Sequence, residues 1–513
     1  MGEIPTSGWR LPRGPRLAPR ALHPVTGPVL SLGLLLGLGL LYPAVLVLIA
    51  AVVAAVQACL NLLPWLARHL HAPSTDADGA AAAARPIWFS VHVPVHNEPP
   101  DIVIRCLDAL ARQQDAPPHE VIVLDNNTPD PALWRPVRDW CRARGRPFRF
   151  IHRQNLRGAK AGALNIALAE ADSQSTHVVV IDADYRATPD FLRVAAMALR
   201  ASGASFLQFP QSFEARDANA QGLAIELADY FRRPARLADQ GRAMLLTGTL
   251  SVLSRPALAS IGGWSARTST EDADTGLRLL QAGFAGRYVD RIVGHGLMAF
   301  DLDALKMQRS RWAQGNARTL MLMLQSEMRA RRLSAGQICL IALQLTAWTN
   351  LSLPAVVLTG IAPLLWIDGH HAKAQAVAAL ALLTLVLALY GGLVPFVTAL
   401  RHGGLSPRSL RVAVMTRLAL HPASSIATIK GLLPLPQLFL RTPKCHTAPP
   451  VQNSRWAMIG LTALLAALMP LLHGMAAIFL GSFVILLFLS LCTWSAAVAG
   501  DAIRHYARRE ALG

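Results

Sequence analysis

Apolar residues are concentrated in two parts of the chain, and the first lies near its start. Residues 28–66 form an apolar stretch without a charged residue, whereas one helix needs only about 20 such residues to cross a bilayer. We therefore expect a hairpin of two membrane helices here, with a turn from Tyr42-Pro43 onward. A cleaved signal peptide is the alternative, but its apolar core is about 7 to 15 residues long.

The second apolar part begins after residue 333. Four apolar runs there are long enough, or nearly long enough, to cross a bilayer. Segment 334–400 contains the runs 338–367 and 374–400, and segment 456–499 contains the runs 457–472 and 475–499. Together with the hairpin they give six expected spans. Residues 409–433 are also apolar but are interrupted by Arg417, His421 and Lys430, which is typical of an interfacial helix.

Basic residues set the expected orientation. The leader 1–27 carries four arginines and one acidic residue, and further basic clusters occupy the intervening segment 401–455 and the tail 500–513. Because cytoplasmic loops are enriched in Lys and Arg, the leader, the intervening segment and the tail are expected in the cytoplasm.

Between these apolar parts, residues 86–333 follow a linker at 67–85 and have another periodicity. Short buried-strand patterns alternate with helical patterns; the strands are expected at 87–95, 121–124, 148–152 and 178–181, and the helices at 102–113 and 159–171. This alternation predicts an α/β domain with parallel strands. Such sheets bind ligands beyond the carboxyl ends of their strands.

Composition and charge narrow the class of protein. The chain of 513 residues is 53% hydrophobic and 16% charged, which excludes a disordered chain and argues against an ordinary soluble enzyme. Its six cysteines lie far apart and predict neither a disulfide scaffold nor a zinc module. The net charge of +18 follows the membrane topology, so no nucleic-acid partner is expected.

Polar residues follow three of the predicted strands. Asn97-Glu98 come after the first, Asp125 after the second, and Asp182-Ala183-Asp184 after the fourth. D-x-D spacing occurs four times in the chain, but only Asp182 and Asp184 directly follow an apolar strand. Two such carboxylates can hold a divalent cation whose other ligands are substrate phosphates. The alternative is a turn in which an Asp caps the next helix.

Two further motifs combine chemistry with a helix. Thr270-Glu271-Asp272 precedes a helical pattern at 274–282, so Asp272 is either a simple cap or a general base for an acceptor hydroxyl. Gln308, Arg311 and Trp312 lie on a helix just before the membrane. The guanidinium could bind a pyrophosphate and the indole could stack on a sugar ring, or the pair could be a headgroup anchor.

Taken in order, and with Lys160-Ala-Gly-Ala-Leu-Asn165, these motifs resemble the family 2 glycosyltransferases. More narrowly they are similar to the processive membrane synthases of the cellulose synthase type. The sequences VIVLDNNTPD (121–130) and VVVIDADY (178–185) resemble bacterial synthases of periplasmic β-1,3-type glucans. The resemblance implies an α/β GT-A domain, a Rossmann-like nucleotide-sugar fold, at 86–333. It would lie in the cytoplasm, inserted between transmembrane helices of the bacterial inner membrane.

The same resemblance implies roles for individual residues. Asp272, with Glu271 beside it, would deprotonate the acceptor; Asp184 and Asp182 would hold Mg²⁺ or Mn²⁺; Gln308 and Trp312 would bind the acceptor; and Glu98, Asp125, Lys160, Asp182 and Arg311 would bind the donor. Within a gating-type loop at 439–450, Phe439–Lys444 match the pattern F-x-V-T-x-K except that Arg441 replaces valine. Thr442 and Lys444 would close over the diphosphate.

Two departures from the family pattern limit what is carried over. The paired acidic residues often seen after the second strand are Asp125-Asn126 here. A cyclic-di-GMP receptor domain is not expected after the last span.

The expected function is therefore inverting, metal-dependent transfer of a hexose from a nucleotide sugar, UDP-glucose, to a growing β-glycan, coupled to export across the inner membrane. The expected partners are the nucleotide sugar, the polysaccharide and the lipid bilayer; an export partner is left open. Two alternatives remain: a non-processive transferase acting on a lipid or short acceptor, and a transporter with a regulatory domain. The predicted spans contain no charged residue to mark an ion path, which argues against the transporter.

Overall fold

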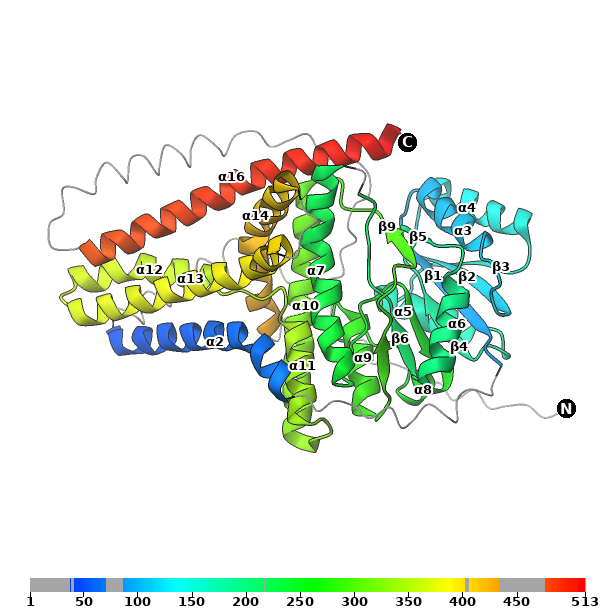
Figure 1. Ribbon diagram of the computed structural model, residues 1–513, viewed down its shortest axis with the longest axis horizontal. Coiled ribbons are helices and arrows are strands. Elements are labelled where there is room, and N and C mark those ends of the chain that lie inside the picture. Colours follow the sequence, from blue (N-terminus) through cyan, green and yellow to red (C-terminus); the bar gives the residue numbers. More distant parts are fainter. Residues whose placement is uncertain are drawn as a thin grey trace, which may run out of the picture.

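The computed structural model describes residue 37 and residues 41–70, 86–215, 217–401, 406–433 and 476–512. An α/β domain lies at one end of the long axis and a bundle of helices at the other (Figure 1). Helices that run across the long axis separate the two parts. The described fold thus has the predicted α/β domain between apolar helices.

The α/β domain is built on a seven-stranded sheet in the order β3-β2-β1-β4-β7-β6-β8. Strands β1 to β4 are parallel, and β7 runs antiparallel to both β4 and β6. The strands are β1 (Phe89–Val95), β2 (His119–Asn126), β3 (Phe148–Arg153), β4 (His177–Val180), β6 (Phe206–Gln208), β7 (Ser251–Ser254) and β8 (Gly286–Tyr288). A second sheet pairs β5 (Tyr185–Ala187) with β9 (Gly294–Gly296).

Burial explains why the central strands read as continuous apolar runs. Phe89, Val91 and Val93 of β1 and Val121 and Val123 of β2 are fully buried, as expected for parallel strands covered on both faces. Helices that cover the sheet include α3 (Pro100–Ala111), α4 (Pro131–Arg144), α5 (Ala159–Ala169), α6 (Phe191–Ser202), α8 (Arg255–Ser260) and α9 (Glu271–Gln281). The predicted α/β fold class is confirmed. The ends of α3 and α5 lie within two residues of those expected from the sequence, and α9 begins three residues before its expected start.

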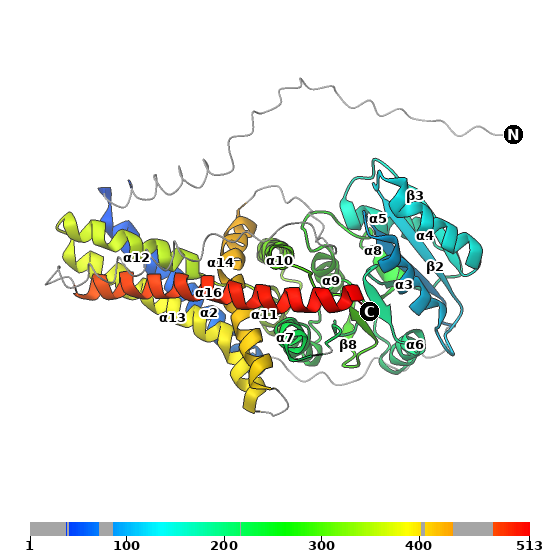
Figure 2. The same ribbon diagram turned by 90° about the horizontal axis from the view of Figure 1, so that it is seen from above.

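Three long helices connect the domain to the bundle: α7 (Ala218–Gln240), α10 (Leu302–Ala330) and α14 (Pro407–Leu432). In Figures 1 and 2, α14 crosses the direction of the bundle helices rather than following it. This direction suits the interfacial helix expected at 409–433. Its length and composition also meet the requirement for a span, so the interfacial location stays a prediction.

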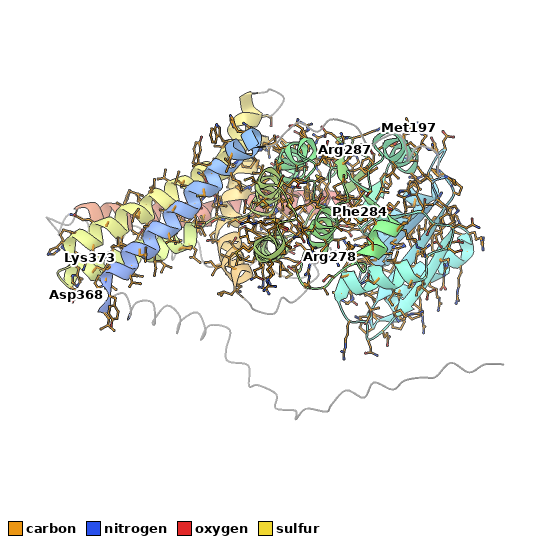
Figure 3. The ribbon with its side chains drawn as sticks, turned by 90° about the horizontal axis from the view of Figure 1, so that it is seen from below. Met197, Arg278, Phe284, Arg287, Asp368 and Lys373 are labelled. Carbon is orange, nitrogen blue, oxygen red and sulfur yellow. The ribbon has the colours of Figure 1, made fainter. Side chains whose placement is uncertain are left out.

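The bundle contains α2 (Pro43–Leu70), α12 (Ser352–Ile367), α13 (His371–Arg401) and α16 (Ala476–Leu512). Helix α11 (Ala335–Leu345) stands beside α10, across the long axis, and contacts α2 (Figure 1). Among the described residues, four helices are long and apolar enough to cross a membrane, within Pro43–His69, His371–Val394, Pro407–Leu432 and Leu486–Arg509. The expected span at 457–472 lies outside the described residues. Asp368, which directly follows α12, and Lys373, in the first turn of α13, mark the end of the bundle remote from the α/β domain (Figure 3).

Two boundaries differ from the sequence expectation. The apolar run 338–367 is divided into α11 and α12, because Asn350 offers its side-chain oxygen to the backbone N–H and the hydroxyl of Ser352. Such local bonds compete with the helical ladder. Residues 500–512, expected as a basic tail, continue α16 as helix.

Candidate active site

A cavity of about 460 Å³ opens at the carboxyl ends of the parallel strands, between the sheet and α10. It is lined by nine of the side chains predicted from the sequence, namely Glu98, Lys160, Asp182, Asp184, Glu271, Asp272, Gln308, Arg311 and Trp312. These residues come from five separate segments of the chain. The structure therefore brings together the strand-end, helix-start and α10 motifs in one pocket.

A lysine holds Asp182, the first of the two carboxylates that follow β4. Lys160, in the first turn of α5, donates from Nζ to Asp182 Oδ1 at 2.6 Å and lies 3.6 Å from Glu271 Oε1. Burial alone would lower the pKa of Lys160, but the charges of Asp182 and Glu271 outweigh it and raise that pKa above its ordinary value. Lys160 is thus a fixed cation between Asp182 and Glu271.

Asp272 lies in the first turn of α9. Its Oδ1 accepts from the N–H of Ala273 at 2.8 Å, and the positive end of the helix favours a carboxylate there. Burial raises the pKa of Asp272 to about 7, with a further upward contribution from Glu271 and an opposing one from Lys160. The side chain can therefore exchange a proton near neutral pH.

A glycine lies against the Asp272 carboxylate. Gly248 has a φ of +100°, and a Cβ there would lie 3.0 Å from Asp272 Oδ2. Thr270 precedes α9 but makes no side-chain capping bond. The motif thus does more than end a loop, because it directs two carboxylates into the pocket.

Helix α10 supplies the opposite wall. Asp301 caps it by accepting from the N–H of Ala304 at 2.6 Å, and Gln308, Arg311 and Trp312 then fall on one face. Ser269 donates to the carbonyl of Arg311 at 3.1 Å, which ties this wall to the segment before Asp272. The Trp312 ring lies in the pocket wall and stacks on Trp348, with ring centroids 5.8 Å apart and planes at 27°.

Three predicted residues are not among the lining side chains. Asp125 is fully buried behind the wall, where its Oδ1 lies 3.1 Å from His152 Nδ1. Burial raises the pKa of Asp125 in spite of hydrogen bonds with Thr128 and His152. Thr442 and Lys444 lie outside the described residues.

Other lining residues carried no motif that marked them in the sequence. Gln211 lines the pocket and accepts from the Tyr185 hydroxyl at 3.3 Å. It lies just beyond β6, so inspection of that strand's end could have found it. Phe213 and His96 also line the cavity.

A second group of charges lies buried next to this wall. Glu226 of α7 accepts from both terminal nitrogens of Arg309 at 2.9 and 2.6 Å, and Arg417 Nε lies 2.8 Å from Glu226 Oε1. Arg309 also covers the face of Trp348, with Cζ 3.5 Å from the ring centroid. We call Glu226, Arg309 and Arg417 the buried triad.

A smaller cavity adjoins the buried triad. Its volume is about 130 Å³, and its wall includes Asn61, Tyr230, Trp348 and Asn350 as well as both arginines of the triad. Asn61 belongs to α2 and Asn350 precedes α12, so this cavity lies among the bundle helices. Trp348 separates it from Trp312 of the larger pocket.

Comparison with known proteins identifies the domain that carries the pocket. The family model "Glycosyl transferase family 2" matches residues 90–262, and "Glycosyl transferase family group 2" matches residues 177–400. The chain carries a family 2 glycosyltransferase domain. The predicted glycosyltransferase family and enzyme class are confirmed, and the resemblance to the cellulose synthases also holds at the level of individual relatives. The narrower resemblance to β-1,3-glucan synthases stays a prediction.

The cellulose synthase catalytic subunit (UDP-forming) of Xanthomonas axonopodis pv. citri is 30% identical over 242 residues, which are 45% of this chain and 32% of that protein. Glucomannan 4-beta-mannosyltransferase 7 of Arabidopsis thaliana is 28% identical over 256 residues, 48% of this chain and 45% of that protein. The glycosyltransferase chain thus spans less than half the length of either relative.

A solved structure of a mannosyltransferase from Pyrobaculum calidifontis in complex with GDP-Man and Mn²⁺ is 21% identical. The match covers 75% of this chain and 99% of that one, with a TM-score of 0.45.

Proposed function

We propose that this chain transfers a glucosyl unit from UDP-glucose to the hydroxyl of a growing β-glycan with inversion at the anomeric carbon. The observation that carries the proposal is Asp272, a partly buried carboxylate with a pKa of about 7 in the same pocket as Asp184 and Arg311. A general base works best when its pKa lies near the operating pH.

In the proposed reaction the acceptor oxygen attacks the anomeric carbon from the side opposite the diphosphate. The bond from that carbon to the phosphate oxygen breaks, and its electron pair leaves with the nucleoside diphosphate. The acceptor proton passes to Asp272, whose carboxylate accepts from the N–H of Ala273 and whose pKa is raised further by the neighbouring charge of Glu271. One displacement converts an α-linked donor into a β-linkage.

The donor diphosphate would lie along Asp182, Asp184 and Arg311. Among the described residues no cluster of three or more His, Cys, Asp or Glu side chains could hold a metal ion. Two carboxylates after one strand still fit Mg²⁺ or Mn²⁺, provided that donor phosphates supply the remaining oxygen ligands. Such an ion, when bound, would stabilise the negative charge of the leaving group.

The protein's own residues would do the rest of the donor binding. Lys160 would keep Asp182 in place, Arg311 would bind the phosphates through its fork of donors, and Glu98 would contact the nucleoside side. Asp125 would act from behind the wall, through the adjoining Asn126, which lines the pocket. Thr442 and Lys444 remain proposed contacts of the closing loop.

Processive synthesis and export are supported by the Trp312–Trp348 stack. A sugar resting on Trp312 would have the polar cavity with Asn61 and Asn350 on the far side of Trp348. Gln308 would bind the acceptor beside it. We place the glycosyltransferase domain in the cytoplasm and the bundle in the inner membrane, because the basic segments 1–27 and 401–455 are expected on the cytoplasmic side.

The test is a donor screen with membranes that contain the full chain. UDP-glucose, GDP-mannose and UDP-N-acetylglucosamine, each radiolabelled, are supplied with Mg²⁺ or Mn²⁺, and the product is sized and its linkage determined. We expect long β-glucan from UDP-glucose and none from membranes carrying Asp272→Asn. One sugar added per acceptor would support the non-processive alternative, and no transfer from any nucleotide sugar would contradict the proposal.

A further inference from the structure

The last helix extends beyond the bundle. Helix α16 has 37 residues, about 55 Å at 1.5 Å per residue, whereas the hydrocarbon core of a bilayer is about 30 Å thick. In Figures 1 and 2 it follows the bundle, passes α14 and α7, and ends over the α/β domain. One crossing therefore needs only part of the helix, and its last turns can contact the α/β domain.

These last turns pack on the glycosyltransferase domain. Ala502, Ile503 and Tyr506 are at most 3% exposed and belong to the same apolar core as the central strands. The Tyr506 ring meets Phe300 edge to face, with centroids 6.0 Å apart. We call residues 502–509 the α16 arm.

A polar contact fixes the α16 arm to the segment after β9. The hydroxyl oxygen of Tyr506 accepts from the N–H of Met298 at 3.2 Å, in a buried setting. One residue earlier, the N–H of Leu297 donates to the carbonyl of Asp184 at 3.2 Å, and Leu297 lines the pocket. Two neighbouring amides thus join the arm to Asp184.

The same segment is held on its other side by the small sheet. Gly296 pairs with Tyr185, the residue after Asp184, and its N–H donates to the carbonyl of Ser212 at 2.9 Å. Residues 296–298 are therefore held by hydrogen bonds on both sides, with Asp184 on one side and Tyr506 on the other. A shift of the arm would be passed to the backbone of Asp184.

A second polar contact joins the α16 arm to the start of α7. Asp217 caps α7, accepting from the N–H groups of Asn219 and Ala220 at 2.9 Å. Its Oδ2 lies 3.3 Å from His505 Nδ1 and 3.4 Å from a terminal nitrogen of Arg509. The arm thus bridges the start of α7 and the segment 296–300.

We propose that the α16 arm is a positioning element of the donor site, with Tyr506 as its principal positioning residue. It holds residues 297–300 and, through them, the backbone of Asp184 at the phosphate end of the pocket. The donor-binding part of this inference rests on the proposed function, since Asp184 would face the donor diphosphate.

The test compares Tyr506→Phe, which removes only the hydroxyl, and Tyr506→Ala, which also removes the ring, with Arg508→Ala. Arg508 is exposed on the same turn and serves as the matched control. Hydrogen–deuterium exchange of the purified full chain follows peptides covering 184–187 and 294–301. Steady-state kinetics with UDP-glucose separates KM from kcat.

We expect both Tyr506 variants, and not Arg508→Ala, to exchange faster at 294–301. The loss of one hydrogen bond of about 1 kcal/mol corresponds to roughly fivefold faster exchange through local opening. The KM for UDP-glucose should rise by a similar factor in Tyr506→Phe, more in Tyr506→Ala, with kcat within about twofold of wild type.

Unchanged exchange at 294–301 in both Tyr506 variants would overturn the inference. So would faster exchange accompanied by a lower kcat at constant KM, because the arm would then not act on donor binding. Exchange that rises equally in all peptides would indicate a purely structural role and would also overturn it. If the wild type fails to use any donor, the proposed function falls, while the exchange result still decides whether the arm holds this segment.

Discussion

Two groups of buried charge lie on either side of Trp312, and their balance is opposite. In the pocket, Asp182, Glu271 and Asp272 surround one ammonium, that of Lys160. In the buried triad, two guanidiniums surround one carboxylate, that of Glu226. The first group faces a cavity of about 460 Å³, whereas the carboxylate of the second is fully enclosed.

The difference shows how the surrounding charge decides the state of a buried acid. Burial alone raises the pKa of any carboxyl, and in the pocket the extra negative charge of Glu271 raises that of Asp272 further. Burial has the same tendency at Glu226, but Arg309 and Arg417 outweigh it and lower that pKa. An excess of acidic side chains therefore suits a carboxylate that accepts a proton. An excess of arginines suits a carboxylate that stays ionised and joins α7, α10 and α14.

The largest expected effect comes from neutralising the base. Asp272→Asn should lower kcat by about 10³-fold, within the range typical of general-base catalysis, while UDP binding is kept. Asp274→Asn makes the same chemical change two residues later, where the carboxylate pairs with Arg267 and Arg278 instead of lining the pocket. Kinetics and UDP titration of both variants check this, and equal loss of kcat in the two would contradict the role of Asp272.

A substitution in the buried triad should lower the stability of the protein rather than its catalytic rate. Glu226→Gln leaves two buried guanidiniums without a counter-charge, which costs about 3–5 kcal/mol in comparable cases. Thermal unfolding of the detergent-purified protein measures it. Asp303→Asn on α10 is the control, because Asp303 is 85% exposed in its pair with Lys306 and such pairs contribute little. Equal unfolding temperatures for Glu226→Gln and wild type would contradict the role of the triad as a joint.

Much of the pocket could be predicted because its residues follow local rules. Asp182 and Asp184 end an apolar strand, and Asp272 begins a helix, so each position could be read from a few neighbouring residues. Gln308, Arg311 and Trp312 are spaced for one face of a helix. Strand order then brings these segments together.

The buried triad and the α16 arm have no such local signature. Arg309 lies between two pocket residues in the sequence, yet its partner Glu226 is 83 positions away on another helix. Tyr506 reaches Met298 across 208 positions, in a segment whose basic composition predicted only a tail. Which side of α10 carries the triad, and how far α16 continues, depend on tertiary packing that no short pattern records.

The pH dependence of the reaction should depend on the charges in the pocket and not on those of the buried triad. Asp272 acts as a base only when ionised, so kcat/KM should fall as the pH drops below about 7, by about tenfold per pH unit in the limit. Because Lys160 lowers the pKa of Asp272, Lys160→Gln should move the inflection upward, by about one pH unit. Glu226→Gln should leave the inflection in place. An unchanged inflection in Lys160→Gln would show that another group controls the profile.

The smallest expected effect concerns the aromatic boundary between the two charge groups. Trp312→Phe keeps an aromatic face but loses part of the contact with Trp348, and aromatic pairs contribute about 0.5–1.5 kcal/mol. We expect weaker retention of the polymer, seen as shorter chains at equal sugar incorporation. Trp140→Phe, at the distant contact between α4 and β3, is the control and should leave chain length unchanged. If Trp312→Phe also gives chains of wild-type length, the polymer does not depend on this stack, and the cavity behind Trp348 loses its main support as an export path.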